Sequence, residues 1–181
     1  EISTPVRRVF FGRFGGRLTP IQEIVFQAFD GNRDLLVMAG TGSGKTEAVL
    51  APLAQTFSNA PRVAPSSGTR ALVVSPTRSL ASDLYERMAS RFADLGLRLD
   101  VKTSDRSTVG SKPSDVLIRT PEGIDGALCR RPDQFSEIGF VVIDELHKFL
   151  DGPRGSQLVG LFARLDAFAH TIGESDISDR G

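Results

Sequence analysis

The chain has 181 residues, 22 basic and 22 acidic side chains, and a formal net charge of zero. This length suits one domain with a core of ordinary size. The charge balance excludes a global basic field, so any contact with nucleic acid must be local. The single cysteine, Cys129, excludes an internal disulfide and favours a reducing compartment. With no apolar stretch of membrane-spanning length and no signal-peptide pattern, we expect a cytoplasmic protein without a membrane partner.

Strand-like and helix-like patterns alternate along the chain. Short apolar runs predict five buried strands, at Leu35–Ala39, Ala71–Ser75, Leu99–Thr103, Val116–Thr120 and Phe140–Asp144. Apolar residues recur every three or four positions in segments 80–95 and 158–165, which predicts helices facing a core. The alternation predicts an α/β fold with a mostly parallel central sheet, helices on both faces and right-handed crossovers.

A glycine-rich loop follows the first predicted strand. It consists of Ala39, Gly40, Thr41, Gly42, Ser43, Gly44, Lys45 and Thr46. It follows the pattern G-x-x-x-x-G-K-[ST] except for alanine at the first position. Glycines let the backbone wrap phosphate oxygens, and a helix beginning near Gly44 would direct its N–H groups at the same anion. Lys45 would neutralise the β- and γ-phosphates and Thr46 would bind Mg²⁺. The alternative is a glycine turn that binds nothing.

Two carboxylates, Asp144 and Glu145, follow the last predicted strand. They should lie at the C-terminal edge of the sheet, where open α/β folds bind ligands. Asp144 would hold magnesium, directly or through water, and Glu145 would activate the attacking water. An acidic pair at the start of a helix is more often only a cap. Its combination with the Lys45 loop favours catalysis.

These segments, in this order, resemble the first RecA-like domain of a superfamily 2 helicase. Segment 39–46 is similar to motif I, where alanine at the first position is usual, and segment 144–147, Asp-Glu-Leu-His, resembles motif II of the DExH branch. Segments 19–22, 75–78 and 120–122 resemble the Q motif and motifs Ia and Ib, and segment 147–165 is most similar to the large helicase-related (Lhr) group. The resemblance implies a RecA-like P-loop NTPase domain at 1–172. Residues 173–181 lack apolar periodicity and predict a flexible tail.

Gln22 has two interpretations. With Thr19 it matches a capping box, with Pro20 at the first helical position, and this role needs no ligand. By the resemblance, its amide would instead hydrogen-bond adenine, whose donor and acceptor pattern it matches. Three phenylalanines lie upstream: Phe10, Phe11 and Phe14. One of them could stack on the base, and the alternative for each is a core position.

Hydroxyl and guanidinium side chains form a candidate ridge for nucleic acid. Its members are Thr77, Arg78, Thr103, Thr120 and Arg154, the last by resemblance only. Each of these segments alone is an ordinary helix cap, but several on one edge favour contacts to the backbone of a DNA or RNA strand, with little sequence preference. By the resemblance, His147 would link the nucleotide site to a second RecA-like domain.

The resemblance implies the ATP-binding lobe of an ATP-dependent nucleic-acid helicase or translocase. Motif III and the second RecA-like domain do not follow in this sequence, so we expect the chain to bind ATP–Mg and one strand but to hydrolyse little. One alternative is a motor that pumps duplex without unwinding it. Another is a switch that uses ATP only to set conformation. Glu145 disfavours the switch, because a switch needs no water-activating carboxylate.

Overall fold

The computed structural model describes residues 1–60, 62, 68–110, 112–150 and 152–178, without the side chains of Phe14 and of residues 168–178. The chain divides into two compact units. The N-terminal unit comprises Glu1–Val63 and Ala89–Leu97, and the sheet unit comprises Ala64–Met88 and Arg98–Gly181. One helix, α4 (Arg78–Asp94), contributes residues to both units.

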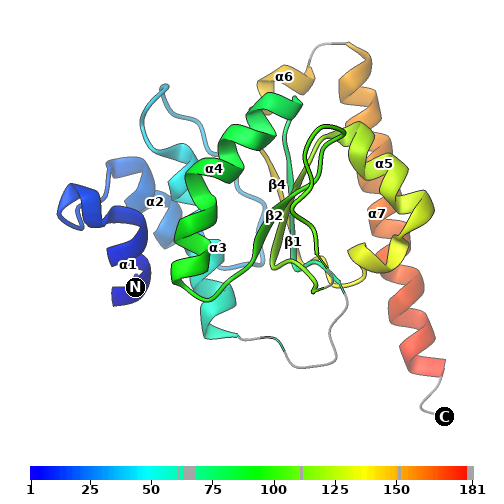
Figure 1. Cartoon of the computed structure of the whole chain (residues 1–181), viewed down its shortest axis with the longest axis horizontal. Helices are drawn as coiled ribbons and strands as arrows, with labels where there is room; N and C mark the ends of the chain where they lie inside the picture. Colours follow the sequence, from blue (N-terminus) through cyan, green and yellow to red (C-terminus); the bar gives the residue numbers. More distant parts are fainter. Residues whose placement is uncertain (61, 63–67, 111, 151, 179–181) are drawn as a thin grey trace. The chain divides into compact units, whose positions relative to one another are not determined.

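The N-terminal unit is helical. It contains α1 (Thr4–Phe11), a 3-10 turn (Gly12–Phe14), α2 (Pro20–Ala28) and α3 (Lys45–Asn59) (Figure 1). Helix α3 buries more residues than α1 or α2, among them Leu50, Leu53 and Phe57. Phe10 of α1 packs edge-on against Phe92 of α4, with ring centres 6.0 Å apart. Aromatic and aliphatic packing around α3 therefore holds this unit together.

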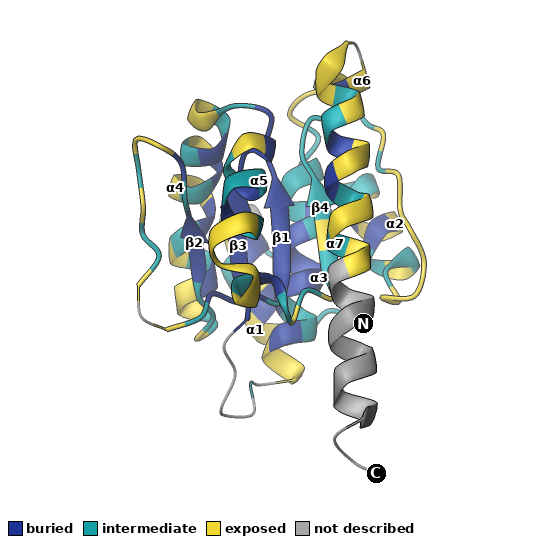
Figure 2. Ribbon diagram, turned by 90° about the vertical axis from the view of Figure 1, so that its right-hand side faces the viewer, coloured by how far each residue is buried: buried dark blue, intermediate teal, exposed yellow. Residues whose placement is uncertain are grey.

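The sheet unit contains four parallel strands in the order β2-β3-β1-β4. They are β1 (Ala71–Val74), β2 (Leu99–Val101), β3 (Val116–Arg119) and β4 (Phe140–Ile143). Every residue of β1, β2 and β3 is buried, whereas β4 is half-buried to exposed (Figure 2). Continuous apolar runs are typical of parallel strands covered on both faces. The predicted parallel sheet is confirmed.

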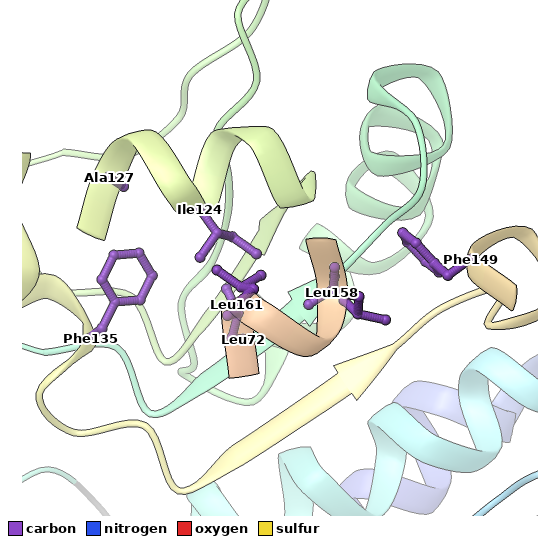
Figure 3. Close-up of a cluster of buried hydrophobic side chains, with 8 residues drawn as sticks. Leu72, Ile124, Ala127, Phe135, Phe149, Leu158 and Leu161 are labelled. Carbon is purple, nitrogen blue, oxygen red and sulfur yellow. The ribbon is translucent and has the colours of Figure 1, made fainter. Parts of the chain in front are cut away.

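Helices flank this sheet. Helices α5 (Pro121–Arg130) and α7 (Pro153–Ser178) cover one face, and between them lie a 3-10 turn (Pro132–Phe135) and the short α6 (His147–Leu150). Leu72 of β1, Ile124 of α5 and Leu161 of α7 meet in one buried cluster (Figure 3). The part of α4 in this unit lies on the other side of the sheet (Figure 1). The predicted α/β architecture with helices on both faces is therefore confirmed.

One predicted strand is wrong. Residues 34–40 form neither helix nor strand, and Leu36 and Met38 are 71% and 79% exposed. The run Leu35–Ala39 has the composition of a buried strand, but a strand also needs a neighbour for its backbone, and no strand among the described residues pairs with it. The other four strands end one or two residues earlier than predicted, and only β4 is followed directly by a turn.

Helix α7 continues to Ser178, past Gly173, where we expected a flexible tail to begin. The last three residues, 179–181, lie outside the described residues. Across the part of the chain that the structure describes, no helix is both long enough and apolar enough to cross a membrane.

Candidate functional site

The glycine loop lies in the N-terminal unit and ends where α3 begins at Lys45, as predicted. Gly42 and Gly44 have φ angles of 76° and 85°, a left-handed conformation that favours glycine. The N–H of Ser43 donates to the carbonyl of Gly40 at 3.3 Å, so the loop turns back on itself before the helix. The N–H groups of the first turn of α3 follow directly, as anion binding at a helix N-terminus requires.

Lys45 closes this loop. Its Nζ donates to the carbonyl oxygens of Ala39 at 2.7 Å and Gly40 at 2.8 Å. A phosphate entering the loop would offer this ammonium a charged acceptor in place of two neutral ones, and charged hydrogen bonds are stronger. Ser43 has a buried Oγ without a hydrogen-bond partner. Buried hydroxyls are normally bonded, so this one fits a loop shaped for a ligand.

Two side chains of the α2 N-terminus hold the loop backbone. The hydroxyl of Thr19 donates to the carbonyl of Ser43 at 2.9 Å, and Nε2 of Gln22 donates to the carbonyl of Gly44 at 3.3 Å. The same two residues form the capping box of α2, in which the Thr19 N–H donates to Oε1 of Gln22 at 2.9 Å. We predicted the cap from the sequence but not the contacts to the loop, because 24 residues separate Thr19 from Ser43.

Gln22 is 5% exposed, and both ends of its amide have partners within the N-terminal unit. Phe10 and Phe11 are 2% and 1% exposed and pack on Phe92 and Phe26, respectively. These two phenylalanines are core residues, the alternative that the sequence left open for them. The side chain of Phe14 lies outside the described residues.

Asp144 and Glu145 lie in the sheet unit, directly after β4. The Asp144 N–H donates to the carbonyl of Val74, so this residue sits at the C-terminal edge of the sheet, as predicted. Burial raises the pKa of the Asp144 carboxyl, and the neighbouring Glu145 carboxylate raises it further, while Arg87 and Lys148 oppose the shift. A half-buried carboxylate beside a second one is a good ligand for a cation, because the cation relieves both costs.

Glu145 adopts a left-handed backbone, with φ of 53°, and it is the one non-glycine residue with positive φ in the described part of the chain. The helix after it begins only at His147, so the acidic pair precedes α6 rather than opening it. A spacing of three residues would bring His147 to the side of Asp144 only within a helix. Asp144 is not in a helix, and the exposed His147 instead lies with Nδ1 3.4 Å from Oε2 of Glu145. The turn therefore brings His147 to Glu145.

The structure places the candidate ridge residues in the sheet unit, but they differ in access. Thr103 is 9% and Thr120 is 7% exposed. Thr103 accepts a hydrogen bond from the N–H of Arg106 at 3.0 Å, and Thr120 caps α5 by accepting from the N–H of Gly123 at 3.4 Å. Thr77 is half-buried and accepts from the N–H of Leu80 in the first turn of α4. The two buried threonines serve the fold first, as helix cap and turn.

Arg78 and Arg154 are the accessible cations of the ridge, with side chains 61% and 48% exposed. Arg154 donates to the carbonyl of Pro76 at 3.3 Å, which brings the start of α7 to the segment before α4. Each guanidinium has an acidic neighbour, since Arg78 lies 3.4 Å from Asp105 and Arg154 lies 3.9 Å from Glu122. These carboxylates weaken the local positive field.

The described side chains could hold Mg²⁺ only if phosphate oxygens supplied further ligands. Among the described side chains, no group of three His, Cys, Asp or Glu residues could hold a metal ion. Mg²⁺ in proteins is commonly held by one or two carboxylates, substrate phosphates and water. Thr46 in the N-terminal unit and Asp144 in the sheet unit each offer one oxygen ligand of that kind.

The comparisons with known proteins identify the family. The model of the DEAD/DEAH box helicase family matches residues 19–175. The ATP-dependent RNA helicase dbp3 of Sclerotinia sclerotiorum is 32% identical over 137 residues, which covers 74% of this chain and 23% of dbp3. The Lhr helicase/uracil glycosylase of Escherichia coli is 30% identical over 197 residues, 96% of this chain and 13% of that protein. The chain thus spans less than a quarter of these two relatives.

Solved structures share the fold. The RNA helicase Prp28 from Chaetomium thermophilum bound to ADP has a TM-score of 0.73 and 26% identity, covering 88% of this chain and 40% of its own. The helicase MrfA bound to DNA and AMPPNP has a TM-score of 0.76 and 22% identity, covering 94% and 24%. The chain belongs to the DEAD/DEAH box helicase family, and its fold is that of the first RecA-like lobe of these proteins.

Proposed function

We propose that this chain is the ATP-binding lobe of an ATP-dependent helicase or translocase that acts on nucleic acid. The observation that carries the proposal is the glycine loop at the start of α3. This loop can bind the phosphates of a nucleotide. It combines left-handed glycines, the Lys45 ammonium and a Ser43 hydroxyl without a hydrogen-bond partner.

The proposed roles divide between the two units. In the N-terminal unit, Lys45 neutralises the β- and γ-phosphates, the loop N–H groups bind their oxygens, and the Thr46 hydroxyl is a ligand of Mg²⁺. In the sheet unit, Asp144 would offer Mg²⁺ a carboxylate ligand and Glu145 would take the proton of the attacking water. Bound Mg²⁺ supplies charge neutralisation between the phosphates. Efficient hydrolysis requires the second RecA-like lobe, to which His147 would connect.

Gln22 has a proposed second role beside its capping role. The Gln22 amide uses one lone pair of its oxygen and one N–H in the contacts to Thr19 and Gly44, which leaves one of each for adenine. The family relationship supports adenine recognition, while the 5% exposure of Gln22 favours the structural role. Nucleotide selectivity of a Gln22 variant separates the two.

The proposed partner is one strand of DNA or RNA, bound through its backbone. The relatives support both RNA and DNA as partners, because dbp3 is named an RNA helicase and the structure of MrfA was solved with DNA. The accessible contacts in the sheet unit are Thr77 and Arg78 at the start of α4 and Arg154 of α7. Because such contacts are made to phosphate oxygens, we expect little base preference.

We also propose that the parent protein is Lhr-like, of the DExH branch. The alignment to the Lhr relative extends over more of this chain than the alignment to dbp3, and segment 144–147 reads Asp-Glu-Leu-His. A motor that pumps duplex without unwinding it is the second candidate. Strand displacement by a chain that carries both lobes distinguishes them, because a pure translocase would hydrolyse ATP without releasing a strand.

Titration calorimetry with a non-hydrolysable ATP analogue and Mg²⁺ tests the nucleotide site in this chain. We expect one saturable site that Lys45→Ala abolishes. The control is Arg8→Ala, which removes an exposed cation of α1 and should leave the affinity unchanged. Unchanged affinity in Lys45→Ala would exclude the loop as the site.

A further inference from the structure

A cavity of about 340 Å³ lies in the sheet unit, away from the glycine loop in sequence. Its wall is formed by residues that follow β2, end β3 and close α5, together with Thr69 and Gln134. All charged residues of this wall are basic: Lys102, Lys112, Arg119, Arg130 and Arg131. Among the described residues, no Asp, Glu or aromatic side chain lines it.

Arg119 is the buried charge of this cavity. It is 7% exposed, yet its hydrogen bonds go to neutral acceptors, the carbonyl of Gly123 at 2.8 Å and Oε1 of Gln134 at 3.1 Å. Its buried Nε has no partner. Burial, together with the nearby charge of Arg130, lowers the pKa of Arg119 to about 10. A buried guanidinium normally has a carboxylate or another anion as partner, since the desolvation cost is otherwise unmatched.

A second buried group of this wall, the hydroxyl of Thr69, also lacks a partner. Thr69 is 1% exposed, and its hydroxyl has no hydrogen-bond partner, although its N–H donates to the carbonyl of Gln134 at 2.8 Å. The wall therefore contains two buried donors without acceptors, one on Arg119 and one on Thr69. Neither Lys102 nor Arg130 forms an ion pair with any carboxylate that the structure describes. Arg131 pairs with Asp133, which is not part of the wall, at 3.6 Å, while Lys102, Arg119 and Arg130 have no negatively charged acceptor among the described residues.

We infer that this cavity binds a phosphate group, at a site separate from the nucleotide loop. Oxyanions with several acceptor oxygens satisfy clustered guanidinium, ammonium and hydroxyl donors. The cavity volume is at the small end of ligand pockets, which span roughly 300–1,000 Å³, so it suits a phosphate or pyrophosphate more than a whole nucleotide. Without an aromatic side chain in the wall, a base would find no stacking partner, and recognition is of the phosphate alone.

The phosphate could come from a small solute or from the backbone of a strand, and the experiment separates these sources. The probe is sodium pyrophosphate, titrated calorimetrically into the Lys45→Ala chain at low chloride, so that the glycine loop contributes as little as possible. We expect one saturable site. Arg130→Gln in this background should weaken it at least tenfold, and because Arg130 is exposed the variant should fold normally.

Arg8→Gln is the matched control, since it removes the same charge from an exposed position in the N-terminal unit and should leave pyrophosphate binding unchanged. The second arm adds an unstructured single strand. Displacement of pyrophosphate by the strand, with loss of strand binding in Arg130→Gln, would assign the phosphate to nucleic acid. Pyrophosphate binding without displacement would assign a small solute. Absence of pyrophosphate binding, or equal effects of Arg130→Gln and Arg8→Gln, would overturn the inference.

Discussion

The side-chain nitrogen of Gln22 lies 3.3 Å from the carbonyl oxygen of Gly44, at the residue where the glycine loop becomes helix α3. Gly44 has a left-handed backbone, and a Cβ built on it would collide with the same nitrogen. Glycine is therefore required at this position for two separate reasons, backbone conformation and the approach of the Gln22 amide. The two requirements can be measured separately.

Gly44→Ala should destabilise the chain by about 2 kcal/mol or more, since it adds both left-handed strain and the collision with Gln22. Gly42→Ala is the control, because Gly42 has a similar φ of 76° but nothing within 4 Å of its added Cβ. It should lose only about 1 kcal/mol. Denaturant unfolding measures both, and equal losses would mean that the Gln22 amide moves aside at no cost.

Gln22→Ala should lower the free energy of unfolding by about 1 kcal/mol, the usual scale of losing a helix cap. If the amide also reads adenine, ATP affinity should fall much more than GTP affinity. Thr19→Ala is the matched control, because it removes the other half of the capping box and the contact to Ser43 but no amide. A Gln22→Ala chain with an unchanged ratio of ATP to GTP affinity would leave only the structural role.

Asp144→Asn should stabilise the ligand-free chain at neutral pH. The folded-state pKa of Asp144 is raised, so the folded chain binds its proton more tightly than the unfolded chain does. This contribution to stability is complete below the unfolded pKa and disappears as pH rises through the folded pKa. The melting-temperature difference between Asp144→Asn and the original chain should therefore shrink on acidification from pH 7 to pH 4. A constant difference would assign the effect to something other than the charge.

Glu145 allows strain and chemistry to be separated. Glu145→Gly should raise stability by up to about 1 kcal/mol, because glycine adopts positive φ without the Cβ penalty. Glu145→Gln keeps the backbone cost and removes only the repulsion with Asp144, so it should raise stability less than Glu145→Gly. In a chain that carries both lobes, Glu145→Gln should lower ATP turnover by roughly 100-fold or more, the scale of a lost general base. Turnover within a few-fold of the original would remove Glu145 from the chemistry.

Arg78→Ala should weaken binding to single strands and leave ATP affinity unchanged. Asp105→Asn is the opposing variant, since it frees Arg78 from its acidic neighbour and should strengthen strand binding. Two accessible cations predict a shallow salt dependence, with a log–log slope of about −0.7 per neutralised phosphate on a single strand. Fluorescence anisotropy at several salt concentrations measures both effects. Variants that shift affinity in the same direction would contradict a direct role for Arg78.

The sequence correctly predicted those strands in which an apolar run also has a neighbouring strand to pair with. Strands β1 and β3 read as continuous apolar runs, and both are buried with a partner on each side. The run Leu35–Ala39 reads the same way, but its composition could not reveal that no described strand pairs with it. Similarly, the helix start at Lys45 follows from the Gly-Lys-Thr pattern, which is local.

The parts of the site that the sequence could not predict depend on residues distant in the chain or on backbone geometry. The hydroxyl of Thr19 reaches Ser43 through the packing of α2 on α3. The left-handed backbone of Glu145 has no sequence signal, since glutamate rarely adopts it. Thr103 and Thr120 looked available for a strand, yet local hydrogen bonds to the backbone bury their hydroxyls in turns and caps.

The position of strand β4 in the sheet affects how the protein should behave at high concentration. It is an end strand of the sheet, pairs with β1 only among the described strands, and its sequence Phe-Val-Val-Ile contains no charge. Val141 is 40% exposed on it. The opposite end strand, β2, is shorter and is flanked by Arg98 and Lys102, which discourage pairing. Aggregation of this chain on concentration should therefore start from β4, by addition of a strand from a second molecule, and Val141→Lys should suppress it.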